Sequence, residues 1–233
     1  MKKCILICFL GIDGSGKSTL SRYLYSELKL KNYDVSYKWW LDGENSLLRN
    51  ALRKISGLKQ STIIIDNISN NPKKNRGSMM SKTIRILYPS IVLIDYLWFG
   101  IINAWIPMIL NKQKVIIFDR FIYDVLLSIS NEFRLSDSSK ESLFGTYSKF
   151  FPSLDLIFVV NVTPELSYSR KKEEIGSINN ASIILERYKD IYDFINRKYL
   201  NDVAYIDNTR TVDISKKEIL DKTMKFIENI YKN

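Results

Sequence analysis

One short glycine-rich segment constrains this chain more than any other feature. Residues 11–19 read GIDGSGKST, which matches the pattern G-x-x-x-x-G-K-[ST] in full. The segment follows the apolar run KCILICFL at residues 3–10 and precedes leucines at four-residue spacing. The first pattern predicts a strand buried on both faces, and the second predicts a helix from Lys17 to about Lys31. A strand, a glycine-rich turn and a helix start in this order predict a phosphate-binding loop.

The residue types of this loop fit a nucleoside triphosphate. Glycines permit positive φ, so that backbone N–H groups converge on an anion, and the helix N-terminus adds unpaired N–H groups and its dipole. Lys17 is expected to reach the β- and γ-phosphates, and the Ser18 hydroxyl is expected to bind Mg²⁺. We therefore predict that ATP binds here with Mg²⁺. The expected nucleotide-binding residues are Gly11, Ile12, Asp13, Gly14, Ser15, Gly16, Lys17, Ser18 and Thr19.

A second apolar segment, VIIFD at residues 115–119, ends in a carboxylate. A buried strand that ends in Asp beside a phosphate loop is the Walker-B pattern, which predicts that Asp119 meets Mg²⁺ through a water molecule. Because Asp is also common as a turn or cap residue at strand ends, this assignment depends on the neighbouring loop.

The remaining chain alternates strand-like and helix-like segments without a linker that would divide it. Residues 78–111 are helical in pattern but contain Pro89 and Pro107, which predicts a kinked or broken helix pair. Strands alternating with helices predict a three-layer α/β fold with a parallel sheet, here the P-loop NTPase fold in one domain over residues 1–233. Further strands are expected over 33–40, 154–162 and 203–207, helices over 45–56, 122–150, 165–173, 182–200 and 216–231, and a mobile loop over 57–77.

Composition excludes several kinds of site. The chain has no histidine, so His-based triads, His general bases and His-ligated metals are excluded. The two cysteines, Cys4 and Cys8, lie in one apolar segment. They are expected to be reduced core residues of a cytoplasmic protein.

Two segments imitate membrane signals. Residues 1–10 have a basic start and an apolar run but no small-residue cleavage site, so they are assigned to the first core strand. Residues 96–110 are free of charge, but these 15 residues are fewer than the roughly 20 that span a membrane. We therefore expect a buried or dimer-forming helix and no membrane partner.

The chain is strongly basic, with a formal net charge of +10. Such a balance favours anionic partners, including nucleotides and nucleic acid. The lysines and arginines are scattered along the sequence, which is typical of a solvated basic surface, and a dedicated nucleic-acid patch is the alternative. No nucleic-acid partner is expected.

Asp119 is followed directly by Arg120 and Phe121. A strand-ending Asp-Arg-aromatic run downstream of a G-x-D-G-x-G-K-S loop resembles the thymidylate kinase family. Residues 155–170, DLIFVVNVTPELSYSR, resemble that family's fourth strand, the Pro after it and the arginine that opens its mobile lid, here near 170–182. Residues 205–210, YIDNTR, resemble its last strand and adenine-side loop. The resemblance covers nearly the whole chain, is weakest over 40–110, and implies the sheet order 2-3-1-4-5.

The resemblance implies transfer of the γ-phosphoryl group of ATP to a small-molecule acceptor, a nucleoside monophosphate with dTMP as the first candidate. By this resemblance Asp13 positions the acceptor or its sugar hydroxyl, and Arg120 holds the acceptor phosphate. Arg170 covers the γ-phosphate when the lid closes, and Arg210 lies on the adenine side. Together with Lys17, the first three are the expected catalytic residues. The alternatives are an ordinary ion pair for Arg120 and a solvated side chain for Arg170.

The acceptor side departs from the family pattern. The Arg-x-Pro stretch expected after the second strand is replaced by KWWLD at residues 38–42. The candidate acceptor-binding residues are therefore Trp40, Arg85, Tyr88 and Tyr96. Trp40 could stack on a base, but aromatic residues of this kind more often lie in the core. A kinase of the same fold for a nucleoside or another metabolite, and a regulatory nucleotide-binding protein with little turnover, stay open. Because the family often forms dimers, residues 91–110 are a candidate homodimer surface.

Overall fold

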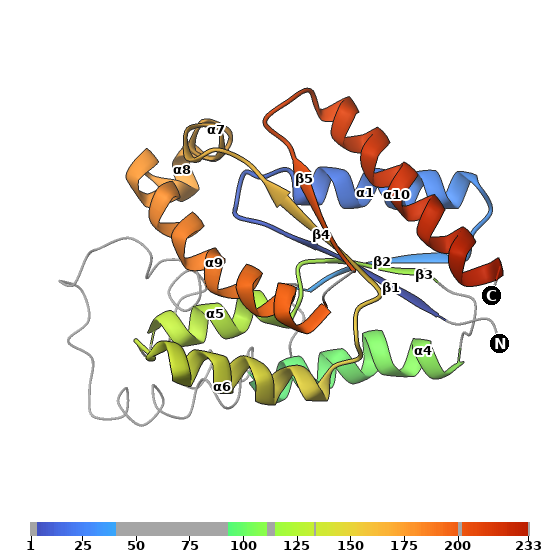
Figure 1. Cartoon of the computed structure of the whole chain (residues 1–233), viewed down its shortest axis with the longest axis horizontal. Coiled ribbons are helices and arrows are strands. Elements are labelled where there is room, and N and C mark those ends of the chain that lie inside the picture. The colour runs from blue at the N-terminus through green and yellow to red at the C-terminus, as the bar shows by residue number, and fades with distance from the viewer. Residues whose placement is uncertain (1–3, 41–92, 111–114, 133, 200–201, 233) are drawn as a thin grey trace, which may run out of the picture.

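The computed structural model describes residues 4–40, 93–110, 115–132, 134–199 and 202–232. In this part of the chain a central β-sheet lies between two layers of helices (Figure 1). The strands are β1 (Ile5–Leu10), β2 (Val35–Trp39), β3 (Val115–Asp119), β4 (Leu156–Asn161) and β5 (Val203–Asp207). The helices are α1 (Lys17–Leu30), η3 (Ile101–Trp105), α4 (Ile106–Leu110), α5 (Ile122–Glu132), α6 (Asp137–Tyr147), η4 (Ser148–Phe150), α7 (Pro164–Arg170), α8 (Lys172–Ile175), α9 (Ile178–Tyr199) and α10 (Val212–Lys232).

The sheet has five strands in the order β2-β3-β1-β4-β5, and every neighbouring pair is parallel. The central strand β1 pairs with β3 through Ile7 opposite Ile117 and with β4 through Ile7 opposite Leu156. This architecture confirms the predicted α/β class and the 2-3-1-4-5 order, and it is compatible with the P-loop nucleotide-binding fold.

Side chains of β1 alternate between two hydrophobic cores, because successive residues of a strand point to opposite faces. Ile5, Ile7 and Phe9 belong to one core, whereas Leu6 and Cys8 belong to the other. All six residues of β1 are buried, as the uninterrupted apolar run predicts for a central parallel strand.

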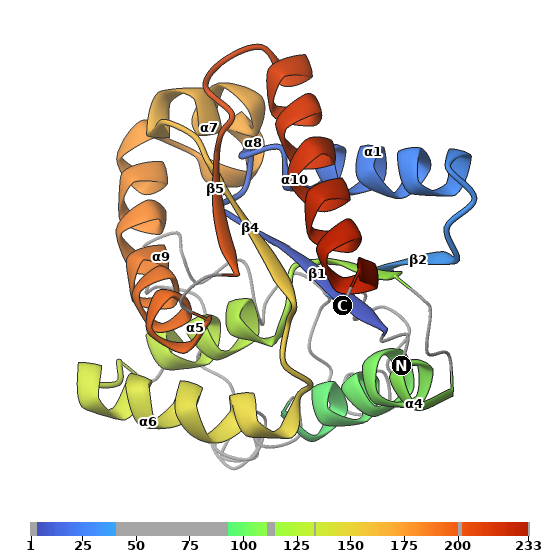
Figure 2. The same ribbon diagram turned by 45° about the vertical axis from the view of Figure 1, so that its right-hand side comes forward.

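Each core is closed by its own layer of helices (Figure 2). The core beneath α1 and α10 contains Leu20, Leu24, Leu28, Ile219 and Ile227. The opposite core is formed by apolar side chains of residues 93–110, α5 and α9, with smaller contributions from α6. The three-layer prediction is therefore confirmed.

The two cysteines take the predicted core positions. Cys4 and Cys8 are both buried, and neither forms a disulfide bond. Burial is the first cause that raises the pKa of the Cys8 thiol, and the nearby carboxylates of Asp124 and Asp119 raise it further. Because the thiolate is the nucleophilic form, Cys8 is suited to packing and not to catalysis.

The stretch that contains Pro107 was predicted to be kinked or broken. The helix through residues 93–110 is not broken at Pro107. Residues 93–100 are α-helical, and the π-helical turn η3 lies between them and α4. Pro107 lacks an N–H and would crowd the carbonyl four residues earlier in a regular helix. The π turn, in which Ile106 N donates to Ile101 O, widens the helix directly before the proline.

The same helix was expected to be either buried or dimer-forming, and the structure contradicts the buried form, whereas the dimer stays a prediction. Leu93–Leu110 is long and apolar enough to cross a membrane by length and composition, and only 28% of it is buried. Trp98 and Ile109 are 62% and 66% exposed. In contrast, Asp95 and Tyr96 lie on the packed side of the helix. A large apolar face is therefore open to solvent along one helix.

Several sequence predictions fall outside the described residues. These are the helix expected over 45–56, the loop over 57–77 and the first part of the helical stretch that starts at 78. Arg85 and Tyr88, two candidate acceptor residues, lie there as well.

Candidate active site

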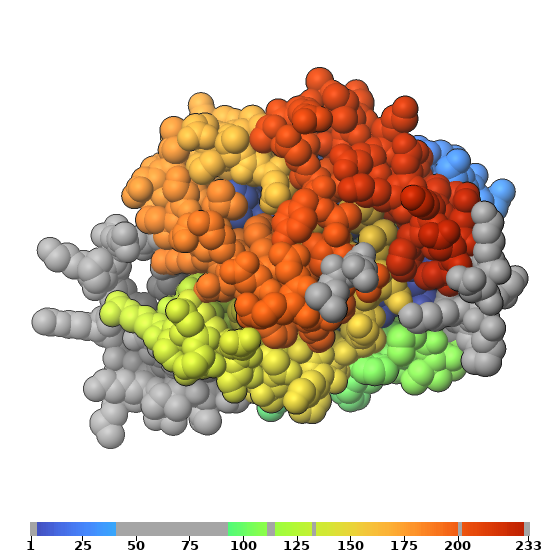
Figure 3. All heavy atoms as spheres, viewed as in Figure 1, coloured from blue at the N-terminus to red at the C-terminus, as the bar shows by residue number. Residues whose placement is uncertain are grey.

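The phosphate-loop motif lies where β1 ends and α1 begins, at the carboxyl edge of the sheet. On this edge β1 stands between β3, which ends at Asp119, and β4, which ends at Asn161. Ligands of open α/β sheets bind outside the carboxyl ends of the strands, at the point where the connections change side. In Figure 3 a hollow between the α7 and α9 regions leaves blue atoms of the N-terminal part of the chain visible.

Two glycines of the loop are required by their surroundings. Gly14 and Gly16 have φ values of 77° and 92°, which side chains of L-residues rarely adopt. A Cβ atom at Gly14 would lie 2.6 Å from the backbone oxygen of Ser167, and one at Gly16 would collide with the Asn208 amide. The loop therefore packs directly against α7 and the segment after β5.

No side chain among the described residues caps the first turn of α1. Gly16 is the N-cap residue and provides no side chain that could accept from the first N–H groups. An uncapped helix N-terminus has unpaired N–H donors and the positive end of the helix dipole. Ser18 is half-buried and Thr19 exposed in this turn, as a loop that meets a ligand from solvent requires.

Lys17 is buried and folded over the loop. Its ammonium donates to the carbonyl of Ile12 at 3.0 Å and to Asp13 Oδ1 at 3.2 Å. Burial and then repulsion from Arg120 lower the pKa of Lys17, while the carboxylate of Asp13 acts in the opposite direction. The ammonium of Lys17, which is predicted to meet the phosphates, therefore lies inside the loop and is paired with the carboxylate of Asp13.

Arg120 lies at the centre of a network that joins four elements. The residue follows β3 directly and adopts a positive φ of 69°. Its guanidinium pairs with the carboxylate of Asp13 from the loop and, at 2.8 Å, with Asp124 Oδ1 from α5. The Tyr188 hydroxyl from α9 accepts from Arg120 at 3.1 Å and donates to Asp124 Oδ1 at 2.5 Å. The arginine is therefore held from three sides.

The carboxylate of Asp13 is shared by the two cations. Burial alone would raise the pKa of Asp13, but attraction to Arg120 and Lys17 and their hydrogen bonds lower it to about 2. Asp13 is therefore ionised at neutral pH, and it links the phosphate loop to Arg120.

Asp119 has the environment expected of a magnesium-binding carboxylate. It is buried at the end of β3, and its Oδ2 accepts from the Tyr37 hydroxyl of β2 at 2.8 Å. Its Oδ1 is buried without a hydrogen-bond partner among the described residues. A buried carboxylate oxygen without a donor is unfavourable unless a cation or water meets it. Asp119 and the Ser18 hydroxyl are therefore suited to Mg²⁺. That these two residues bind the ion stays a prediction.

The two arginines expected around the nucleotide differ in their contacts. Arg170 donates from Nη1 to the carbonyl of Gly14 at 3.1 Å and from Nη2 to the carbonyl of Asn208 at 3.3 Å. It is therefore bound to backbone and not simply solvated. Arg210 is 67% exposed at its side chain and forms a 3.6 Å surface pair with Asp207. The adenine-side role of Arg210 stays a prediction.

The acceptor candidates within the described residues lie in the core. Trp40 is fully buried and packs on the rings of Phe99, Phe118 and Phe121. Tyr96 is buried as well. A side chain that stacks on a base needs a free face, so the structure favours the core interpretation of Trp40 that the sequence had left open. The acceptor-binding role of both residues has no structural support.

Sequence reasoning missed five side chains that complete this site. Asp124 lies in the first turn of α5, four residues after Arg120, but Arg120 lies before the helix, so no helical spacing marks this pair in the sequence. Tyr37 and Tyr188 come from distant segments, and no local pattern marks them. The same is true of Ser167 and Asn208, which contact the loop from outside.

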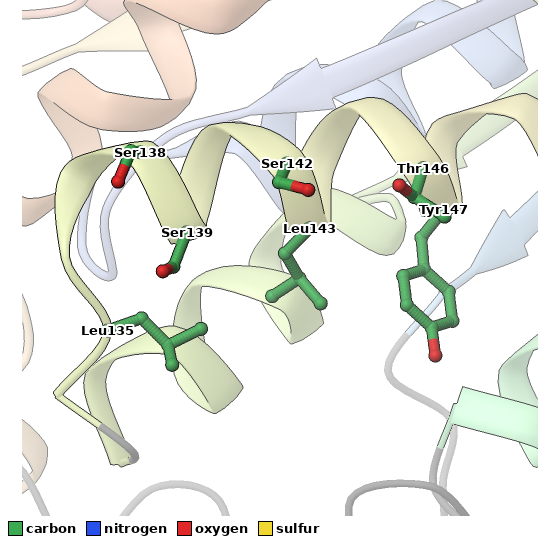
Figure 4. Close-up of a pocket in the computed structure, with 7 residues that line it drawn as sticks. All are labelled: Leu135, Ser138, Ser139, Ser142, Leu143, Thr146 and Tyr147. Carbon is green, nitrogen blue, oxygen red and sulfur yellow. The ribbon is translucent and has the colours of Figure 1, made fainter.

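A cavity of about 400 Å³ lies elsewhere, along one face of α6 and the turn before it (Figure 4). Among the described residues, its lining contains leucines and hydroxyl side chains and no charged residue. It is formed by Leu135, Ser138, Ser139, Ser142, Leu143, Thr146 and Tyr147. Because phosphate sites need converging donors and positive charge, this cavity does not compete with the loop.

We compared the sequence with protein-family models and with curated proteins, and nothing matched. Function is therefore inferred from the fold and from the geometry of the site. Both are compatible with a P-loop nucleotide-binding protein.

Proposed function

We propose that this chain is a Mg²⁺-dependent kinase that transfers the γ-phosphoryl group of ATP to a small-molecule acceptor, similar to thymidylate kinases. The first candidate acceptor is a nucleoside monophosphate, and dTMP is the first to test. One observation carries the proposal: Lys17 of the loop and Arg120 after β3 share the carboxylate of Asp13. A protein that only binds nucleotide has no need for a second, fixed cation beside the loop.

The residues divide the work of positioning and charge stabilisation. Backbone N–H groups of the loop and the start of α1 would hold the donor phosphates, with Lys17 at their β,γ-end. Asp119 and Ser18 would hold Mg²⁺, which supplies charge neutralisation on the phosphate oxygens when bound. Arg120 would face the acceptor, because its planar fork can grip two oxygens of a phosphate. Phosphoryl transfer needs this kind of positioning more than covalent help.

A neutral acceptor is a second candidate, and one observation favours it. Arg120 is already paired with two carboxylates, those of Asp13 and Asp124. An acceptor phosphate must therefore compete with these carboxylates, whereas the hydroxyl of a nucleoside could accept from Arg120 or donate to Asp13 without displacing them. The two candidates differ only in the charge of the acceptor.

The proposal is tested by ADP release from Mg²⁺-ATP with a panel of acceptors. The panel contains dTMP, dUMP, the other monophosphates, the matching nucleosides and a blank without acceptor. We expect acceptor-dependent ADP release that is lost in Lys17→Ala and kept in Lys31→Ala, an exposed lysine just after the same helix. A rate that does not exceed the blank for any member, despite ATP binding, would contradict kinase activity towards nucleotides and nucleosides.

A further inference from the structure

Four consecutive carbonyls of the phosphate loop accept hydrogen bonds from side chains. Lys17 reaches the first of them, Ile12 O. The other three are bound from outside the loop. Ser167 Oγ donates to Asp13 O at 2.6 Å, Arg170 Nη1 to Gly14 O at 3.1 Å, and Asn208 Nδ2 to Ser15 O at 2.7 Å.

The three outer donors come from two neighbouring elements. Ser167 and Arg170 lie on α7 at a spacing of three residues, which places them on one side of the helix. Asn208 follows β5, and its N–H donates to Asn161 O at the end of β4. Because β4 and β5 are adjacent in the sheet, α7 and Asn208 meet the same side of the loop. We call Ser167, Arg170 and Asn208 the loop brace.

The brace fixes the direction of the loop's N–H groups. In a trans peptide the C=O of one residue and the N–H of the next point in opposite directions. The structure has no cis peptide bond within the described residues. When Asp13 O and Ser15 O point outward to Ser167 and Asn208, the N–H groups of Gly14 and Gly16 point to the opposite, phosphate side.

Two members of the brace are fully enclosed. Ser167 is 1% exposed and Asn208 is 2% exposed. The close approach of Gly14 to Ser167 and of Gly16 to Asn208 shows that the brace touches the loop without intervening space. Removal of either donor leaves a buried carbonyl without its partner, which is costly and allows the peptide to rotate.

We infer that Ser167, Arg170 and Asn208 are positioning residues that preorganise the phosphate loop for the triphosphate of its nucleotide. This inference rests on one part of the proposed function, which is that the loop binds phosphate. It gives Arg170 a different task from closure over the γ-phosphate, because both of its bonded nitrogens hold backbone carbonyls. Arg170 also joins the loop to the Asn208 segment, since one nitrogen contacts each of them.

The test measures the affinity for Mg²⁺-ADP and for inorganic tripolyphosphate by calorimetry. We expect Ser167→Ala to weaken binding about fivefold and Asn208→Ala about tenfold or more, because each change removes a hydrogen bond to a buried carbonyl. Ser169→Ala is the matched control, because its hydroxyl donates to Leu166 O in its own helix turn and to no other described residue.

Thermal melting of each variant separates positioning from loss of fold. We expect the variants to bind phosphate more weakly while their melting temperature stays close to that of the wild type. We also expect a raised KM for ATP with a smaller change in kcat. Unchanged affinity in both Ser167→Ala and Asn208→Ala would overturn the inference, as would an equal loss in Ser169→Ala. If the variants weaken phosphate binding but no acceptor is phosphorylated, the brace is supported and the proposed kinase activity fails.

Discussion

The donor side and the acceptor side of the site are built in different ways. The donor side is one continuous segment, residues 11–19, placed by a buried strand and the start of a helix. The proposed acceptor side centres on Arg120, which is held by Asp13, Asp124 and Tyr188 from three other parts of the chain. A local motif can be recognised without a structure, whereas a network of distant residues can be recognised only after folding.

The largest expected effect is on the donor side. Lys17→Ala removes the buried cation of the loop and should lower kcat/KM for ATP about 10³-fold, because charge stabilisation is the main contribution to phosphoryl transfer. The measurement is steady-state ADP release with saturating acceptor. A loss of less than tenfold would mean that another cation meets the phosphates.

A change on the acceptor side should affect stability as well as turnover. Asp124→Ala removes the buried carboxylate that pairs with Arg120 and accepts from the Tyr188 hydroxyl, and should lower the free energy of unfolding by about 3 kcal/mol. Urea unfolding at neutral pH gives this value. The control Asp137→Ala breaks a pair whose carboxylate is 96% exposed, so its effect should stay below about 0.5 kcal/mol. Equal effects of the two changes would contradict a buried network around Arg120.

The link between the two sides, Asp13, predicts a pH dependence. Its pKa falls from 3.8 to about 2 on folding, so ionised Asp13 stabilises the fold above pH 3.8 and this contribution is lost as the pH falls towards 2. After a discount for its 39% exposure, we expect about 1 kcal/mol. Unfolding of the wild type and of Asp13→Asn, compared at pH 5 and at about pH 2.5, measures it. The stability gap between the two proteins should narrow at the lower pH, and a constant gap would refute the linkage.

The smallest effect on turnover is expected from the exposed helix. We propose that its apolar face, which includes Trp98 and Ile109, packs against a second copy of the chain. Trp98→Glu should then convert a dimer to a monomer in light scattering while ADP release changes less than twofold, because the face is separate from the loop. A wild-type protein that is monomeric at micromolar concentration would eliminate this dimer.

Elements with a strong local signal could be predicted to within a few residues. The apolar runs gave β3 and β5 their observed bounds, and α1 was predicted one residue too long. Pro164 marked the start of α7, where Thr163 accepts from Leu166 N as the N-cap. These signals are local because steric and capping preferences act over a few residues.

Features set by tertiary packing could not be predicted in this way. The sequence of Trp40 and its neighbours fits both a core position and stacking on a base. Only the packing of its ring against Phe118 and Phe121 favours the core. Pro107 could kink, break or widen its helix, and the π turn is one of several solutions. Arg170 was expected to face phosphate, but the carbonyls that bind it come from two distant segments.

Kinase activity at this site is tested most directly by measuring where the γ-phosphoryl group of ATP goes. ATP labelled at the γ-phosphate is incubated with Mg²⁺, the protein and the panel of monophosphates and nucleosides, and the label on each acceptor is measured. We expect labelled acceptor with the wild type and with Lys31→Ala, and none above background with Lys17→Ala. Tight ATP binding without label on any acceptor, or transfer that persists in Lys17→Ala, would contradict the claim that this loop and Arg120 form a kinase site.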